Sequence, residues 1–177
     1  MIVTAIREVS DMSSMFRSDP LLIEVGVGEF SVAEHPQRLM TPALGSCVGV
    51  AIWDPLLHRG ALAHIMLPRP AEGATMADQG RFAASVVPEL VRLMVDSGSL
   101  KRRLCAKIAG GAAMFRSDSG LASIGERNVA EVKRQLSLMS VPVVAEDIGA
   151  AHARTVELLL DSGVLLVRSY RYGVRRL

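Results

Sequence analysis

The sequence contains the apolar segment Leu44-Gly45-Ser46-Cys47-Val48-Gly49-Val50-Ala51-Ile52-Trp53 and, shortly after it, a second one, Ala61-Leu62-Ala63-His64-Ile65-Met66-Leu67. Both have the length and composition of β-strands, and the intervening residues 54–59 begin with the turn-forming pair Asp54-Pro55. The two segments therefore predict an antiparallel hairpin whose strands carry a thiol, Cys47, and an imidazole, His64.

The register of this hairpin decides whether the thiol and the imidazole can meet. If Trp53 pairs with Gly60, Cys47 faces Met66 and His64 is its diagonal neighbour on the same face, about 7–8 Å away between α-carbons. A shift of two residues would place Cys47 directly opposite His64. A shift of one residue would send the two side chains to opposite faces of the sheet, which would exclude a pair.

Two interpretations of Cys47 and His64 follow from the residues themselves. A free thiol is mostly protonated at neutral pH, so a neighbouring imidazole that takes its proton turns it into an effective nucleophile. Free cysteine is also among the most buried residue types, and a lone histidine in an apolar strand is often a core residue with its hydrogen bonds satisfied. The segments alone leave an active-site pair and two core side chains both open.

Composition predicts one globular domain. The chain has 177 residues, of which 50% are hydrophobic and 21% charged, with a net charge of +2. The basic residues are scattered apart from two clusters, Lys101-Arg102-Arg103 and the group Arg171, Arg175 and Arg176. We interpret both clusters as solvated surface and expect no nucleic-acid partner.

The two cysteines, Cys47 and Cys105, do not form a disulfide framework, and Cys105 is predicted to be a core residue of a strand. Charged residues interrupt any signal-peptide core near the start, and the uncharged stretch 39–53 is too short to span a bilayer. We therefore expect a cytoplasmic protein without membrane insertion. Neither HExxH nor CxxC spacing occurs, so no metal is expected.

Strand patterns and two helical patterns alternate along the chain. Residues 1–20 are expected to form a flexible or helical arm and residues 21–177 a single domain. One helix is predicted over 75–97, kinked or divided by Pro88 and stopped by Gly98. A second follows a capping box of Ser123 and Glu126 and buries the stripe Val129, Val132, Leu136 and Met139. Strands are predicted at 21–27, 29–33, 46–53, 60–67, 104–109, 143–146, 155–160 and 164–169, with a turn at 161–163.

Four blocks of the sequence stand in a characteristic order: Leu44-Gly-Ser-Cys-Val-Gly-Val-Ala-Ile-Trp-Asp54, Gly60-Ala-Leu-Ala-His-Ile-Met-Leu-Pro68, Ala106-Lys-Ile-Ala-Gly-Gly-Ala-Ala-Met-Phe115 and Ile124-Gly-Glu-Arg-Asn-Val129. With these blocks the chain resembles the CheD family, the chemoreceptor glutamine deamidases of bacterial chemotaxis, over roughly residues 21–170. The resemblance implies an α/β domain whose mixed sheets form a sandwich-like core flanked by the two helices, as in cysteine-dependent toxin deamidases.

The resemblance also implies the roles of three side chains. In the family the cysteine of the first block is the nucleophile, the histidine of the second block is its partner, and a threonine six residues before the cysteine completes the site. These positions are Cys47, His64 and Thr41 here. By its own sequence context, Thr41 beside Pro42 would be interpreted as a turn residue.

The implied reaction is hydrolysis of receptor glutamine side chains to glutamate through a thioester on Cys47. Backbone N–H groups around Gly45, Ser46 and Cys47 are candidates for the oxyanion hole, and no cofactor is required. Methyl-accepting chemoreceptors are the implied substrates, a CheC-type phosphatase is a further partner, and hydrolysis of receptor methyl esters would follow the same route. A non-catalytic regulator that binds receptors or the phosphatase is the alternative function, and a thiol sensor is a third.

The chain departs from the family near residue 150. Family members tend to read Asp-x-Gly-Gly-x-x-Gly-Arg, whereas residues 147–154 have alanine at positions 150 and 153. If either position requires a positive φ angle, alanine is strained there and glycine is not. We therefore expect the shape of this loop to differ, while Thr41, Cys47 and His64 are unaffected.

Overall fold

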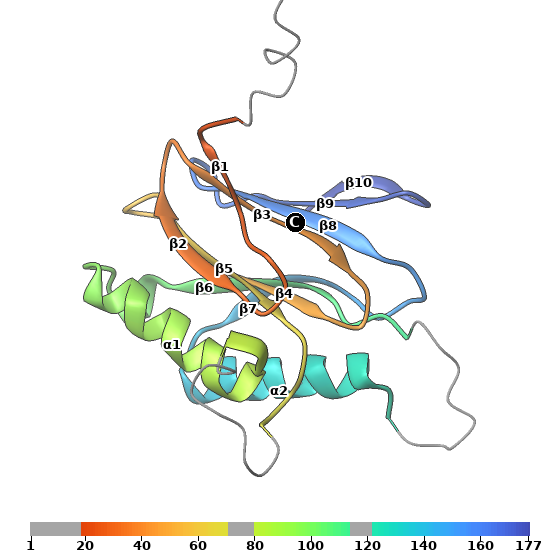
Figure 1. Ribbon diagram of the computed structural model, residues 1–177. Coiled ribbons are helices and arrows are strands. Elements are labelled where there is room, and N and C mark those ends of the chain that lie inside the picture. Colours follow the sequence, from red (N-terminus) through yellow and green to blue (C-terminus); the bar gives the residue numbers. More distant parts are fainter. Residues whose placement is uncertain (1–18, 71–79, 114–121) are drawn as a thin grey trace, which may run out of the picture.

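The computed structural model describes residues 19–70, 80–113 and 122–177, so most of the predicted amino-terminal arm lies outside it. Two five-stranded sheets stack face to face, and two helices cover the outer face of one of them (Figure 1). Each sheet contains one parallel pair and otherwise antiparallel pairs. The predicted α/β fold, with mixed sheets in a sandwich flanked by two helices, is confirmed.

The first sheet contains, in spatial order, β1 (Leu22–Glu24), β3 (Arg38–Leu44), β8 (Arg154–Leu159), β9 (Leu165–Ser169) and β10 (Gly173–Arg176). The second contains β2 (Phe30–Glu34), β5 (Arg59–Ile65), β4 (Val48–Asp54), β6 (Cys105–Gly110) and β7 (Val143–Ile148). The hairpin of β4 and β5 pairs Trp53 with Gly60. This is the register that places His64 diagonal to the position of Cys47.

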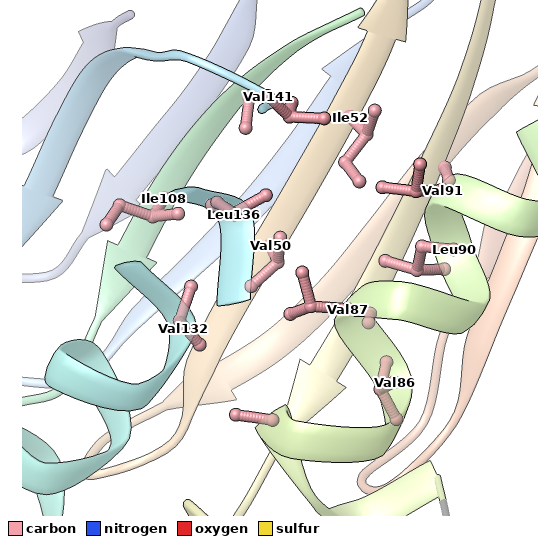
Figure 2. Close-up of a cluster of buried hydrophobic side chains, with 14 of the residues drawn as sticks. Val50, Ile52, Val86, Val87, Leu90, Val91, Ile108, Val132, Leu136 and Val141 are labelled. Atoms are coloured by element: carbon pink, nitrogen blue, oxygen red, sulfur yellow. The ribbon is translucent and has the colours of Figure 1, made fainter. Parts of the chain in front are cut away.

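Strand β4 is covered on both faces, which explains its unbroken apolar sequence. Val50 and Ile52 face the helices, whereas Ala51 belongs to the core between the sheets. Figure 2 shows the hydrophobic cluster between the second sheet and the helices, in which side chains of β4 and β6 contact side chains of both helices. Its labelled members are Val50, Ile52, Val86, Val87, Leu90, Val91, Ile108, Val132, Leu136 and Val141.

Helix α1 (Ala83–Asp96) is continuous through Pro88, so of the two predicted outcomes, a kink or a division, the division does not occur. Pro88 costs the helix one backbone hydrogen bond, while Val87 and Leu90 on either side are fully buried against the second sheet and hold the helix in place. The helix begins at residue 83 rather than near 75, and residues 71–79 lie outside the described chain. Gly98 has a φ of 99°, as expected for the stop.

Helix α2 (Ile124–Leu138) matches its prediction. The Ser123 hydroxyl accepts from the Glu126 N–H at 3.2 Å, and the Glu126 carboxylate accepts from the Ser123 N–H at 2.6 Å, which completes the capping box. Val132 and Leu136 are fully buried, and Val129 and Met139, the other two residues of the predicted apolar stripe, pack against the same core. The stripe is therefore core, as predicted.

Strands β3 and β10 were not predicted, and β3 is the one that carries Thr41. The expectation that Thr41 is a turn residue is wrong, because it is a fully buried strand residue paired with Val156. Proline obscures this strand in the sequence. The pairing shifts between Thr41 and Leu44, so Pro42 and Ala43 form a bulge, where a missing N–H costs no ladder hydrogen bond.

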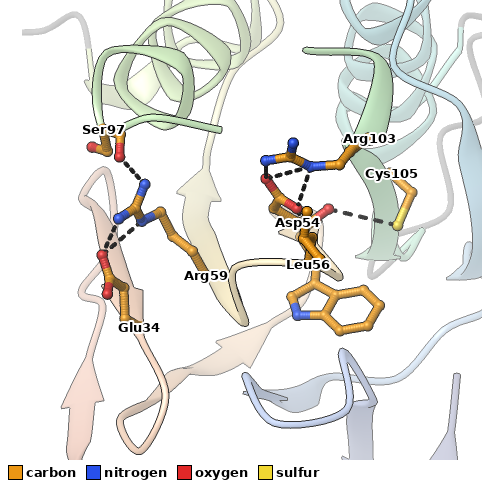
Figure 3. A network of polar contacts seen from close by, with 8 residues as sticks. Glu34, Asp54, Leu56, Arg59, Ser97, Arg103 and Cys105 are labelled. Carbon is orange, nitrogen blue, oxygen red and sulfur yellow. Dashed lines mark hydrogen bonds and ion pairs between the residues drawn. The ribbon is translucent and has the colours of Figure 1, made fainter. Parts of the chain in front are cut away.

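A polar network fixes the end of the hairpin far from Cys47 (Figure 3). The fully buried Asp54 accepts from Arg103 Nη2 at 2.7 Å and Nε at 3.0 Å. Burial opposes ionisation of Asp54, but the hydrogen bonds from Arg103 outweigh it and hold the pKa at about 2.

Nearby, Cys105 begins β6 but is only half-buried, so the prediction of a core position is wrong; its thiol lies 3.7 Å from the Trp53 carbonyl oxygen.

Candidate active site

Cys47 ends a short bend, residues 45–47, that joins β3 to β4, and its side chain is half-buried. The bend is attached to the segment after β6 by two backbone hydrogen bonds. Gly111 N–H donates to the Cys47 carbonyl at 2.7 Å, and Ala112 N–H donates to the Gly45 carbonyl at 2.8 Å. The backbone on both sides of the thiol is therefore held by the second sheet.

The pair Gly110-Gly111 makes this attachment possible. Both residues have positive φ angles, 110° and 64°. A Cβ at Gly110 would lie 2.2 Å from the Cys47 carbonyl oxygen, closer than any real contact allows. Strand β6 therefore ends in a tight turn of the backbone at these glycines, and this lets two backbones approach each other beside the thiol.

His64 lies in β5 opposite Gly49 and is only 1% exposed. Side chains alternate along a strand, so Cys47, two residues before Gly49, is on the same side of the second sheet as His64. That side of the second sheet faces the first sheet, and the Cys47 thiol packs against the hydrophobic core between the two sheets. No hydrogen bond joins the Cys47 thiol to His64 in this arrangement.

Thr41 reaches His64 from the opposite sheet. Its hydroxyl oxygen lies 2.7 Å from His64 Nδ1 and 2.6 Å from the carbonyl oxygen of Val25. A hydroxyl has one proton, which must go to the Val25 carbonyl, because a carbonyl can only accept. His64 Nδ1–H therefore donates to Thr41, and this bond connects β5 to β3 across the sandwich.

This tautomer leaves His64 Nε2 as an acceptor. The atom is buried and has no hydrogen-bond partner within the described part of the chain. Burial lowers the pKa of His64, and burial raises the pKa of the Cys47 thiol. At neutral pH the resting pair is accordingly a neutral imidazole and a neutral thiol, and the sulfur becomes a thiolate only when it gives up its proton.

Three backbone N–H groups beside the thiol are not used by the fold. Those of Gly45, Ser46 and Cys47 donate to no acceptor of another residue among residues 19–70, 80–113 and 122–177. Since N–H groups almost always find a partner when they are buried in a protein, this bend is suited to receive an oxygen from outside.

Asn128 of α2 was missed in the sequence, although it lies within one of the resembling blocks. It is fully buried, and its amide donates to the Ser46 carbonyl at 3.0 Å and the Met66 carbonyl at 2.8 Å. One side chain thus joins the residue before Cys47 to the strand end after His64. Helical spacing offers a signal, since Asn128 stands four and eight residues before buried Val132 and Leu136.

The remaining histidines lie elsewhere. His58 is exposed in the hairpin turn, and its Nδ1 is 2.8 Å from the Asp161 carbonyl oxygen. His152 contacts Arg154 at 3.2 Å. Within the described ranges, no group of three His, Cys, Asp or Glu side chains is arranged to hold a metal ion. No helix in those ranges is long and apolar enough to cross a membrane.

The loop of residues 147–154, where the resemblance predicts glycine at positions 150 and 153, has a positive φ at one of its two alanines. Ala150 has a φ of 61°, whereas Ala153 is not in the positive region. The next residue, Arg154, is buried, and its guanidinium donates to the Gly110 carbonyl at 2.9 Å and the Gly149 carbonyl at 3.0 Å. This loop therefore supports the glycine pair behind Cys47 at the cost of a strained Ala150.

Ala150→Gly is expected to raise the free energy of unfolding by about 1 kcal/mol, because glycine relieves the strain of the left-handed conformation. Ala153→Gly is the matched control and should lower it by about 0.5–1 kcal/mol, because there only the flexibility of the unfolded chain changes. Urea denaturation of both variants measures the difference. Equal effects of the two substitutions would contradict the prediction.

Comparison with known proteins gives consistent matches. A family model described as CheD chemotactic sensory transduction matches residues 66–169. A Moorella thermoacetica protein named probable chemoreceptor glutamine deamidase CheD is 42% identical over 85% of this chain and 92% of its own. The Clostridium novyi protein of the same name is 39% identical over 86% and 96%, and the Bacillus velezensis chemoreceptor glutamine deamidase CheD is 36% identical over 90% and 98%. Among solved structures, a Bacillus licheniformis hypothetical protein, YfiH, matches with a TM-score of 0.43 and 16% identity, over 67% of this chain and 49% of that one.

Proposed function

Because this chain belongs to the CheD family, we propose that it hydrolyses glutamine side chains of chemoreceptors to glutamate, with Cys47 as nucleophile. His64 is the general base and acid, and Thr41 orients the His64 ring. The observation that carries the assignment is the bond from His64 Nδ1–H to Thr41, which leaves Nε2 as an unpaired acceptor on the face of the sheet that Cys47 shares.

The first half of the reaction forms a thioester. His64 Nε2 takes the thiol proton as Cys47 Sγ bonds to the side-chain carbonyl carbon of the glutamine. The carbonyl oxygen becomes an oxyanion, which the N–H groups of Gly45, Ser46 and Cys47 can receive. The imidazolium then returns its proton to the amide nitrogen, the C–N bond breaks, and ammonia leaves.

The second half releases glutamate. A water molecule gives a proton to the same Nε2 and attacks the thioester carbon. The C–S bond breaks, the carboxylic acid forms, and the thiolate takes the proton back from His64. Thr41 stays hydrogen-bonded to Nδ1–H throughout, so the ring keeps its orientation while it changes charge twice.

A chemoreceptor fragment incubated with the protein provides the test. Modified glutamines should gain about 1 Da in ordinary water and about 3 Da in H2(18)O, since the amide nitrogen is replaced by an oxygen from solvent. Peptide mass spectrometry locates the sites. Binding of the fragment without any mass change would contradict the proposal and favour the non-catalytic regulator.

Two further parts of the proposal rest on the family. A CheC-type phosphatase is a binding partner, and the reaction takes place in the cytoplasm, where a reducing environment keeps the Cys47 thiol free. A glutamate methyl ester would give the same thioester on Cys47 with methanol as the leaving group, so ester hydrolysis is compatible with the same site.

A further inference from the structure

Residues 168–177 form a cationic and aromatic surface that the catalytic site does not use. They include four arginines and no aspartate or glutamate. All residues from 170 to 176 are exposed, Tyr170 fully so and Tyr172 by 59%. Arg171 lies over the ring of Tyr172, 5.5 Å from its centre. Arg171 forms no ion pair with any residue that the structure describes, so its charge is available to a partner.

Strand pairing places this surface at the active-site end of the sandwich. Leu44, three residues before Cys47, pairs with Arg154 of β8; the neighbouring Thr155 pairs with Arg168 of β9. Since adjacent strands are about 4.8 Å apart, the turn between β9 and β10 begins about 10 Å across the sheet from Leu44. Figure 1 shows the β9–β10 turn and the connection from β3 to β4 at the same end of the molecule.

A cavity of about 420 Å³ lies beside the β9–β10 turn. Its lining includes Tyr172 and His152, whose ring centres are 4.7 Å apart, and the ion pair of Arg175 with Asp147. Because the charges inside are already paired, the cavity suits a neutral side chain. The unpaired positive charge of Arg171 lies on the exposed turn next to it.

We propose, building on the deamidase function above, that this surface docks an acidic segment of the receptor next to the target glutamine. Its members are Tyr170, Arg171, Tyr172 and Arg175, and we name it the docking surface. Every turnover converts a neutral amide into a carboxylate, so a receptor with several reactive glutamines gains negative charge close to those that remain. Arginine binds carboxylates through two parallel hydrogen bonds. The docking surface therefore favours substrates that are already partly deamidated.

The double variant Tyr170→Ala/Arg171→Glu tests the docking surface, because both side chains lie on the exposed turn. KM for a chemoreceptor fragment is expected to rise at least about tenfold with kcat within about twofold, because binding is lost and the chemistry is not. Hydrolysis of a short peptide with one glutamine and no acidic residues should keep its wild-type kinetics. A fragment with one glutamine replaced by glutamate should show a lower KM with the wild-type protein and no such gain with the double variant.

Arg102→Glu is the matched control. Arg102 is also exposed, but it precedes β6, whose opposite end, Gly110, contacts Cys47. It should leave KM unchanged; an equal rise in KM for Arg102→Glu would indicate a general charge effect and overturn the docking surface. An unchanged KM for the double variant would also overturn the docking surface. If the only effect of the double variant were a loss of binding to phosphatidylglycerol vesicles, the surface would be assigned to a membrane, and this result too would overturn the proposal. If the wild-type protein releases no ammonia from either substrate, the deamidase function itself fails.

Discussion

Cys47→Ala is expected to reduce ammonia release from a chemoreceptor fragment by at least about 10⁴-fold, because no other group can form the thioester. The variant should still fold. Cys47 is half-buried at the end of a bend that is held through its backbone carbonyls, and none of those hydrogen bonds requires the sulfur. Thermal unfolding within a few degrees of wild type would show that the loss is chemical.

Cys105→Ala is the control for this experiment. Cys105 is the other free cysteine of the chain; it is also half-buried, and burial raises its pKa as it does that of Cys47. It stands at the start of β6, at the opposite end from Gly110, which contacts the Cys47 carbonyl. Activity close to wild type is expected. Deamidation by Cys47→Ala at more than a small fraction of the wild-type rate would rule out the thioester mechanism, whatever Cys105→Ala does.

The hairpin that carries Cys47 and His64 could be predicted because both of its strands are apolar throughout and a proline-containing turn separates them. The sequence could not choose among the registers. That choice depends on Gly49, which stands opposite His64. Because Gly49 has no side chain, Leu44 fits between the sheets; a Cβ at position 49 would lie 2.8 Å from Leu44 Cδ1. Such a contact joins two sheets and leaves no periodic signal.

Thr41 shows the opposite case. A role in the site is proposed for it from the family resemblance, but its place in a strand could not be predicted from Thr41-Pro42, because a bulge hides the strand pattern. Pairing with His64 requires β3 and β5 to face each other across the core, and only the stacking of the two sheets determines that. Asn128 was missed for a related reason, since its two acceptors belong to segments far away in the sequence.

His64→Ala is expected to lower the rate at pH 7 by at least about 10³-fold and to change the shape of the pH profile. In the wild type, burial lowers the pKa of His64 from 6.5, so the imidazole is neutral at pH 7 and activity should fall only at pH values below 6.5. In the variant no base accepts the thiol proton, and turnover depends on thiolate that forms by itself. Burial raises the pKa of Cys47 above 9.0, so the residual rate should climb about tenfold per pH unit from pH 7 to pH 9.

The slope of that profile separates a base from a structural histidine. If His64 only linked the two sheets through Thr41, its removal would lower stability and activity together, and the pH dependence of the remaining activity would follow the wild type. His58→Ala, which removes an exposed histidine at the far end of the hairpin, should leave both rate and profile unchanged. Thr41→Val should give an intermediate loss, because Nε2 can still accept a proton while the ring is no longer held by the hydroxyl. Alkylation of Cys47 by iodoacetamide, followed from pH 6 to pH 10, measures the thiolate directly. A profile for His64→Ala that coincided with that of the wild type would remove His64 from the mechanism.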